Sequence, residues 1–140
     1  MKEYTAEAIR NIAFIGHGGS GKTTLSEILL YQSNQINRIG SISEGNTVSD
    51  YSPNEIEKQI SISSSLLHLE WNHTKINILD TPGYTDFIGE VKAAMRVCDT
   101  AVMVLKSAEG VEVGSETTGT FINQYGLPSA IIINKIDNEH

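Results

Sequence analysis

The sequence predicts an α/β domain built on a wound, mostly parallel sheet, with one antiparallel edge strand and helices on both faces. Two observations support this fold class. Short apolar segments that fit buried strands alternate along the chain with apolar residues at helical spacing, as in strand–helix–strand units. One pair of strand-like segments follows without a helix between its members, and only turn residues separate them, which indicates a hairpin.

The first half of the chain is expected to hold a strand, a helix and the hairpin. Residues 12–15 form a short apolar run closed by a glycine, and they predict a buried strand. Apolar residues spaced by three and four predict a helix over residues 22–33. Residues 67–71 alternate between apolar and polar, residues 72–74 suit a turn, and residues 76–79 fit a second strand. These last three segments predict the antiparallel hairpin.

The second half continues the alternation. A helical stripe over residues 87–98 precedes an apolar strand over 101–105, and a second stripe over 118–125 precedes a last buried strand over 130–133. A glycine and a proline follow the second stripe, where helices commonly end. The chain ends seven residues after the last apolar run. We therefore expect it to stop before the final strand and helix of such a domain, which leaves one sheet edge bare.

Residues 36–61 break the alternation. They show no clear periodicity and contain scattered glycines and a proline. Structureless loops beyond about 12–15 residues are uncommon in compact domains unless they are functional or disordered. We interpret the segment as a mobile functional loop within a single domain that spans residues 1–140. A tolerated insertion is the alternative interpretation.

Composition narrows the class of protein. The 140 residues hold 10 Lys and Arg against 17 Asp and Glu, for a net charge of −7. This balance argues against binding nucleic acid through bulk electrostatics, which needs clustered basic residues. The single cysteine, Cys98, allows no internal disulfide. No apolar run approaches the roughly 20 residues of a membrane span, and residues 1–10 lack a signal peptide. A soluble, cytoplasmic domain without a membrane partner is expected.

A glycine-rich segment between the first predicted strand and helix fits G-x-x-x-x-G-K-[ST], the phosphate-binding loop of P-loop NTPases. Glycines let the backbone wrap a phosphate, and the following helix adds its positive end. In this pattern Lys22 reaches the β- and γ-phosphates, and the Thr23 hydroxyl binds Mg²⁺. The loop consists of Gly16, His17, Gly18, Gly19, Ser20, Gly21, Lys22 and Thr23.

A second motif, D-T-P-G, follows the strand predicted over residues 76–79. A carboxylate at a strand end, here Asp80, is able to hold Mg²⁺ through water. The Gly83 N–H is then placed to contact a γ-phosphate. The D-x-x-G pattern is common by itself, and its position after an apolar strand makes it informative.

A third motif, N-K-I-D, follows the last predicted strand. The Asp137 carboxylate suits guanine because it can accept hydrogen bonds from both N1–H and the 2-amino group. Adenine would leave that carboxylate unpaired, which argues against an ATPase or kinase. The aliphatic stem of Lys135 covers the base in this interpretation. Ligands of wound sheets bind at the carboxyl edge, so all three motifs, including Asn134, are expected to meet there.

Other candidate residues receive structural interpretations. The His17 side chain is expected to point away from the phosphates. His68 and His73 suit a strand surface and a turn, Cys98 suits the core and Trp71 suits a packed strand position. Glu55 and Glu57 are interpreted as solvated, and no carboxylate pair suggests acid–base catalysis.

These motifs resemble those of translational GTPases, and most closely elongation factor G and its elongation-factor-G-like paralogues. The resemblance runs from about residue 10 to the end. Ribosome-protecting tetracycline-resistance proteins share much of the pattern. The stretches that carry it are Gly16-His17, Gly21-Lys22-Thr23-Thr24, Asp80-Thr81-Pro82-Gly83, Asp86-Phe87, Glu90-Val91, Gly110-Val111, Glu116 and residues 134–137.

The resemblance implies two switch segments. Residues 36–61 correspond to the first switch, in which Ser61 matches the threonine that ligates Mg²⁺ and senses γ-phosphate. The helix beginning near Tyr84 corresponds to the second. Both would order around γ-phosphate and Mg²⁺ and relax after hydrolysis.

The sequence departs from the family pattern at three places. Tyr84 stands where the elongation factors typically have the histidine that helps place the attacking water. Gly19 stands where the loop commonly carries an aspartate, and Gln59-Ile60-Ser61 replaces Gly-Ile-Thr. The tyrosine suggests slow or differently triggered hydrolysis. Together the departures favour an elongation-factor-G-like paralogue over the main translocase.

The expected activity is hydrolysis of GTP to GDP and phosphate by a translation factor that acts on the ribosome through its full length. The resemblance assigns catalysis to Lys22, Gly83 and Tyr84, Mg²⁺ to Thr23, Ser61 and Asp80, and guanine to Asn134, Lys135 and Asp137. The alternative is a GTP-dependent ribosome-protection or regulatory module with weak hydrolysis, which Tyr84 favours. Sequence-specific nucleic-acid binding by this chain is not expected.

Overall fold

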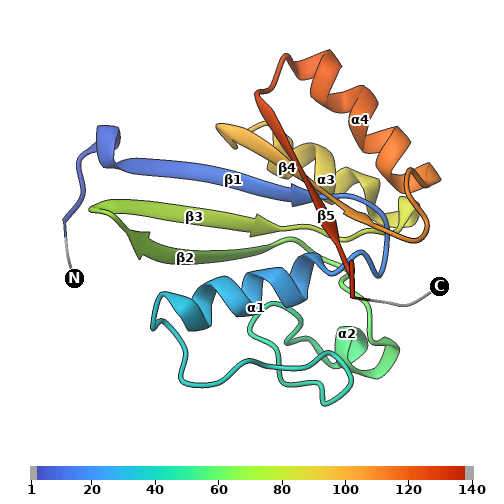
Figure 1. The fold of residues 1–140 in the computed structure, drawn as a ribbon, viewed down its shortest axis with the longest axis horizontal. Coiled ribbons are helices and arrows are strands. Elements are labelled where there is room, and N and C mark those ends of the chain that lie inside the picture. Colours follow the sequence, from blue (N-terminus) through green and yellow to red (C-terminus); the bar gives the residue numbers. More distant parts are fainter. Residues whose placement is uncertain (1–2, 138–140) are drawn as a thin grey trace.

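The computed structural model describes residues 3–137, which form a five-stranded sheet with helices packed against it (Figure 1). The strands are β1 (Ile9–Ile15), β2 (Ser65–Trp71), β3 (Thr74–Asp80), β4 (Thr100–Lys106) and β5 (Ser129–Asn134). The helices are α1 (Lys22–Gln32), α2 (Pro53–Lys58), α3 (Ile88–Met95) and α4 (Val113–Tyr125), with short 3-10 turns at η1 (Ala6–Ala8) and η2 (Thr85–Phe87).

The sheet order is β2-β3-β1-β4-β5. β1 pairs in parallel with both β3 and β4, and β4 pairs in parallel with β5. Only β2 runs antiparallel, against β3, through the expected hairpin. The predicted fold class is confirmed, since the sheet is mostly parallel with one antiparallel strand at its edge.

Alternation along β1 divides the core between the two faces of the sheet. Ala13 and Ile15 pack in a cluster with residues of α3 and α4, among them Val91 and Met95. Phe14 points the other way and packs with Leu30 of α1 and residues of the hairpin. Side chains that alternate along a strand face opposite sides, so helices cover both faces as predicted. Cys98 is buried in the first cluster, as expected.

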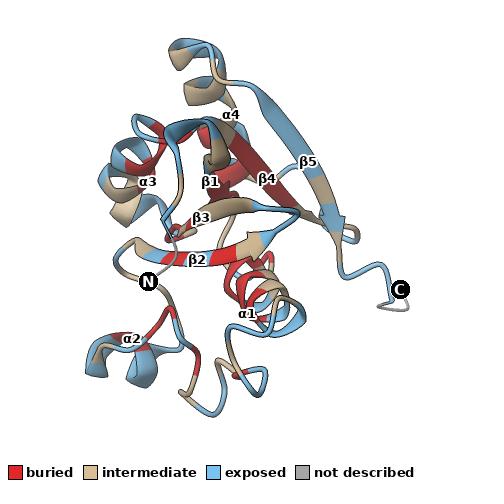
Figure 2. Ribbon diagram, turned by 90° about the vertical axis from the view of Figure 1, so that its left-hand side faces the viewer, coloured by how far each residue is buried: buried red, intermediate tan, exposed pale blue. Residues whose placement is uncertain are grey.

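The β5 edge of the sheet differs from its centre. Figure 2 shows buried residues concentrated on β1 and β4 and largely exposed residues along β5. The prediction that residues 130–133 are buried is therefore wrong: Ile131 and Ile133 are exposed, since within residues 3–137 no strand pairs with the outer side of β5. No helix in this described part is long and apolar enough to cross a membrane.

Two other local predictions fail. The aperiodic segment contains α2, which the pattern missed because six residues are too few to show a helical period. Its signal lies at its start, where Ser52 and Glu55 form a capping box and Pro53 begins the helix. Trp71 is 60% exposed, so its interpretation as a packed residue is wrong. It ends β2 beside an apolar hollow at the end of α1 that leaves the indole open to solvent.

Candidate functional site

The three motifs meet at one edge of the sheet, at the carboxyl ends of β1, β3 and β5 (Figure 1). A pocket of about 110 Å³ lies there between the glycine-rich loop, the segment before β2 and the turn after β3. It is lined by Gly18, Gly19, Gly21, Lys22, Thr23, Ile42, Asp50, Gln59, Ile60, Ser61, Gly83 and Tyr84.

The glycine-rich loop needs glycine where it leaves β1 and where it enters α1. Gly16 has φ +130° and Gly21 has φ +96°, both in the region that favours glycine. A Cβ on Gly16 would overlap the carbonyl oxygen of Val104, and one on Gly21 would overlap the Asn134 amide. The loop is therefore fitted closely against β4 and β5 before α1 begins at Lys22.

Lys22 lies inside this loop with its side chain almost fully buried. Its Nζ donates to the carbonyl oxygens of Gly16 at 3.0 Å and His17 at 2.9 Å. Burial lowers the pKa of Lys22 to about 8, although Asp80 and Asp50 oppose this shift. The ammonium is thus charged at neutral pH but poorly solvated, which favours an anionic ligand.

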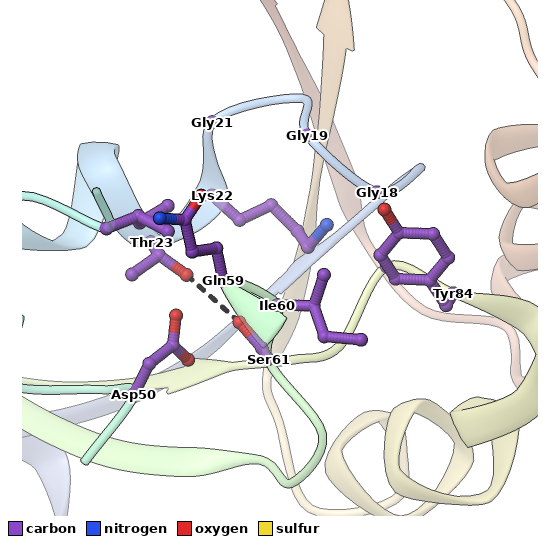
Figure 3. Close-up of a pocket in the computed structure, with 12 residues that line it drawn as sticks. Gly18, Gly19, Gly21, Lys22, Thr23, Asp50, Gln59, Ile60, Ser61 and Tyr84 are labelled. Carbon is purple, nitrogen blue, oxygen red and sulfur yellow. Dashed lines mark hydrogen bonds between the residues drawn. The ribbon is translucent and has the colours of Figure 1, made fainter. Parts of the chain in front are cut away.

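The three predicted metal ligands lie close together. The Thr23 hydroxyl is 3.3 Å from the Ser61 hydroxyl, which brings residue 61 onto the start of α1 (Figure 3). Asp80 is 1% exposed, and neither of its carboxylate oxygens has a hydrogen-bond partner among residues 3–137. Burial raises the pKa of Asp80 to about 6, while the nearby Ser49 and Thr23 hydroxyls and Lys22 partly offset the rise.

This arrangement fits Mg²⁺. Two hydroxyls and a buried carboxylate with both oxygens free are hard oxygen ligands of the kind that this ion prefers. Buried polar atoms are nearly always hydrogen-bonded, so the Asp80 oxygens, which lack a partner among the described residues, fit a site that receives a cation or a water bound to it. The geometry supports the predicted set of Thr23, Ser61 and Asp80 without assigning a ligand distance.

The raised pKa of Asp80 predicts a pH-dependent stability. The folded carboxyl binds its proton up to about pH 6, whereas the unfolded one releases it near 3.8. Folding therefore takes up a proton between these values, so the contribution of Asp80 to stability falls as pH rises through 6. We expect Asp80→Asn to remove about 1 kcal/mol of the stability difference between pH 5 and pH 7 in the ligand-free chain. Urea unfolding at both pH values measures it, and equal pH dependence in both proteins would contradict it.

Asp50 belongs to the same site, although the sequence did not indicate it. It is buried, lines the pocket, and has one carboxylate oxygen without a partner. Burial raises the pKa of Asp50, and the Ser61 hydroxyl and Lys22 lower it in part. A lone acidic residue in an aperiodic segment carries no pattern that distinguishes it. Only the folded chain brings this carboxylate beside Ser61.

Glu27 of α1 fastens the first part of the segment before β2. Its Oε2 accepts from the Gly40 N–H at 2.8 Å, and its Oε1 accepts from the Val48 N–H at 2.6 Å. Glu27 is itself 1% exposed. One carboxylate of α1 thus holds two distant points of residues 36–61 against the helix that begins with Lys22.

Glu55 fastens the second part, and its interpretation as solvated is wrong. Its Oε1 accepts from the N–H groups of Ile62 and Ser63 at 3.0 and 3.1 Å, and its Oε2 accepts from that of Ser52 at 3.2 Å. Burial alone would raise the pKa of Glu55, but these N–H donors lower it overall. Glu57, one residue beyond Ile56, is exposed as expected. These hydrogen bonds hold Ile62 and Ser63, and they thereby position the neighbouring Ser61.

Gly83 and Tyr84 close the pocket from the side of β3. A Cβ on Gly83 would lie 2.6 Å from the Lys22 ammonium and 2.5 Å from the Gly18 nitrogen, so residue 83 touches the loop. The Tyr84 ring lies against Gly18, 3.0 Å from where a Cβ would stand, and is 44% exposed. Figure 3 shows the ring at the mouth of the pocket.

The N-K-I-D motif is tied to the loop through Asn134. The Asn134 amide donates to the Ser20 carbonyl at 2.9 Å, and its oxygen accepts from the Lys135 N–H at 2.9 Å. The Ser107 hydroxyl donates to the Lys135 carbonyl at 2.7 Å. Asp137 is exposed beyond this turn. Asn134 thus joins β5 to the loop and leaves the two charged side chains accessible.

Seven of the predicted nucleotide-binding residues do not line this pocket: Gly16, His17, Ser20, Thr24, Asn134, Lys135 and Asp137. His17 points to α4, where its Nε2 lies 3.3 Å from Glu112 Oε1. This agrees with the expectation that the imidazole turns away. Thr24 is exposed on the first turn of α1. His68 and His73 are exposed on β2 and the hairpin turn, as expected.

The family follows from comparison with known proteins. The model of the elongation factor Tu GTP binding domain matches residues 7–140. The chain belongs to this family. The resemblance to translational GTPases is therefore confirmed, and so is the P-loop GTPase class of the fold.

Relatives with high sequence identity are translation factors by name. The chain is 45% identical over 132 residues to "Ribosome-releasing factor 2, mitochondrial" of Candida dubliniensis, covering 94% of this chain and 16% of that protein. It is 43% identical to "Elongation factor G" of Gluconobacter oxydans, covering 92% and 18%. A crystal structure of a Thermus thermophilus protein superposes with a TM-score of 0.91 at 37% identity, covering 93% and 20%. The chain thus spans about a fifth or less of the length of these proteins.

Proposed function

We propose that the whole protein is an elongation-factor-G-like translational GTPase that hydrolyses GTP to GDP and phosphate on the ribosome. The observation that carries the proposal is the convergence of the Lys22 loop, Asp80 and Asn134 at one sheet edge, with Ser61 brought against Thr23. Relatives named elongation factor G and ribosome-releasing factor support the ribosome as the partner. They favour this function over a regulatory module with weak hydrolysis.

In this proposal the nucleotide phosphates and Mg²⁺ occupy the pocket. The loop amides and Lys22 bind the β- and γ-phosphates, where the buried ammonium gains the anionic partner that it lacks. Thr23, Ser61 and Asp80 hold Mg²⁺, the last through water. When bound, the ion neutralises charge that develops on the phosphate oxygens during transfer. Both carboxylates that face Lys22, Asp80 and Asp50, suit a site that receives a divalent cation.

Guanine is selected by the turn after β5. Asn134 holds this turn to the loop, so the base and the phosphates are recognised by one connected unit. The exposed Asp137 accepts from guanine N1–H and the 2-amino group, and the stem of Lys135 covers the ring. Adenine presents no such pair of donors, so the same turn excludes ATP.

The γ-phosphate is sensed from two sides. Gly83 contacts the loop beside the Lys22 ammonium, and Ser61 is held there by the hydrogen bonds of Glu55 to the residues that follow it. Loss of the γ-phosphate removes a shared partner of both segments. Residues 36–61 are therefore proposed as the first switch and the turn from Gly83 into α3 as the second.

Substitution of Tyr84 tests how GTP hydrolysis is triggered. Its hydroxyl at the mouth of the pocket is able to hydrogen-bond the attacking water, so we expect ribosome-stimulated GTP turnover by the full-length protein. Tyr84→Phe should lower that turnover about tenfold or more, whereas Tyr84→His should raise it less than about tenfold. Single-turnover phosphate release with ribosomes measures both. A gain of about 100-fold or more in Tyr84→His would instead favour the regulatory module.

The proposed place of action is the cytoplasm, where ribosomes translate. Bacterial relatives named elongation factor G support it, while the Candida relative is named mitochondrial. The ribosome and guanine nucleotides are the proposed partners, through the whole protein.

A further inference from the structure

A second lysine lies beside the glycine-rich loop. Lys106 is the last residue of β4, and 17% of its side chain is exposed. A Cβ placed on Gly19 would lie 3.7 Å from Lys106 Cε and 3.9 Å from Lys106 Nζ. Since Gly19 carries no side chain, the ammonium has direct access to the loop backbone at a residue that lines the pocket.

Two carboxylates hold the ammonium in this place. Glu109 Oε2 lies 2.9 Å and Glu112 Oε2 4.0 Å from Lys106 Nζ. The turn after β4 brings Glu109 back over the lysine, because the Gly110 N–H donates to the Lys106 carbonyl at 2.9 Å. The hydrogen bond to Glu109 is the largest of the effects that raise the pKa of Lys106. The side chain therefore stays charged and points along the loop.

The ion pair is easily exchanged for a stronger one. Glu109 is about half exposed, and ion pairs open to solvent contribute little to stability. Phosphate oxygens bind an ammonium more strongly, since a nucleotide concentrates several negative charges on adjacent groups. Glu112 also lies 3.3 Å from His17 of the loop, so this second carboxylate beside Lys106 is itself joined to the loop.

We propose that Lys106 is a second phosphate-binding lysine, which turns from Glu109 toward the phosphate oxygens of a guanine nucleotide beside Gly19. The proposal rests on the proposed function, because it takes the phosphates to lie along the loop. Glu109 then competes with the nucleotide for the same ammonium. A side chain on residue 19 would stand between the two, and glycine keeps the approach open.

Two variants with opposite expected effects test the proposal. Lys106→Met should weaken binding of fluorescent GDP by about five- to tenfold at low salt, and less at high salt, where the charge is screened. Glu109→Gln frees the ammonium and should tighten binding by about two- to fourfold. Lys75→Met is the matched control. It removes the same charge at the amino end of β3, the end away from Asp80. It should leave GDP affinity unchanged.

The outcomes separate this inference from the function on which it rests. A wild-type chain that binds GDP while Lys106→Met binds equally well overturns the inference alone. Equal weakening in Lys106→Met and Lys75→Met assigns the effect to net charge and also overturns it. If Lys106→Met and Glu109→Gln both bind GDP more weakly and both melt at lower temperatures, the Lys106–Glu109 ion pair has a structural role. This result also overturns the inference. A wild-type chain that binds no guanine nucleotide overturns the proposed function, and this inference with it.

Discussion

Lys22→Met is expected to weaken nucleotide binding strongly while leaving the fold intact. Within residues 3–137 the buried ammonium donates to two loop carbonyls, and burial lowers its pKa to about 8. In the proposed site this charge meets two phosphates, so its loss should weaken GDP affinity by about 100- to 1,000-fold. Met keeps the length and apolar stem of the side chain, which limits the loss of packing. Equilibrium titration with fluorescent GDP measures the change.

Stability measurements separate this effect from unfolding. Removing a poorly solvated charge also removes its desolvation cost, so the ligand-free variant should melt within a few degrees of the wild type. Lys75→Met serves again as the matched lysine, and it should bind GDP as the wild type does. GDP affinity of Lys22→Met within about threefold of wild type would contradict the phosphate-binding role.

Glu55→Ala is expected to release the segment that carries Ser61. The change removes the acceptor of three backbone N–H groups and one half of the capping box of α2. Leaving these part-buried N–H groups without their acceptor should destabilise the segment of residues 59–63 by about 2–4 kcal/mol. The amides of Ile62 and Ser63 should then exchange with solvent about 30- to 1,000-fold faster, as measured by hydrogen exchange.

A matched control lies on the same helix. Glu57 is exposed two residues along α2, so Glu57→Ala removes an identical side chain without touching the segment. It should change stability by less than about 0.5 kcal/mol and leave both amides protected. Released Ser61 should also weaken the Mg²⁺ dependence of nucleotide binding in Glu55→Ala. Unchanged exchange at Ile62 and Ser63 would show that Glu55 does not hold the segment.

The fold and the motif residues were predictable because both follow from local signals. Apolar runs mark the buried strands, and the carboxyl ends of parallel strands meet at one edge. Asp80 and Asn134 end two of these strands, and Lys22 follows the loop after the first strand. Their convergence could therefore be predicted without knowledge of tertiary contacts. The hairpin was visible for the same reason, since its two strands are adjacent in sequence.

The contacts that close the site were not predictable. Asp50, Glu27 and Glu55 act through hydrogen bonds or charges to residues far along the chain or to backbone N–H groups, which leave no periodicity. Glu55 looked solvated because an acidic residue in a polar stretch usually is. Its surroundings depend on α2, and the sequence signal for that short helix is the capping box of Ser52 and Glu55. Trp71 was expected to be packed but is exposed. The alternation of apolar and polar residues along a strand does not reveal where a neighbouring helix ends.

The ends of β1, β3 and β5 are proposed to form one guanine nucleotide site. The most direct test is equilibrium binding of fluorescent GDP and ADP, with Mg²⁺, to the wild-type chain and to Asp137→Asn. We expect binding of GDP, preference over ADP by about 100-fold or more, and loss of GDP binding in the variant, since the amide cannot accept both guanine hydrogen bonds. ADP binding as tight as that of GDP would contradict it.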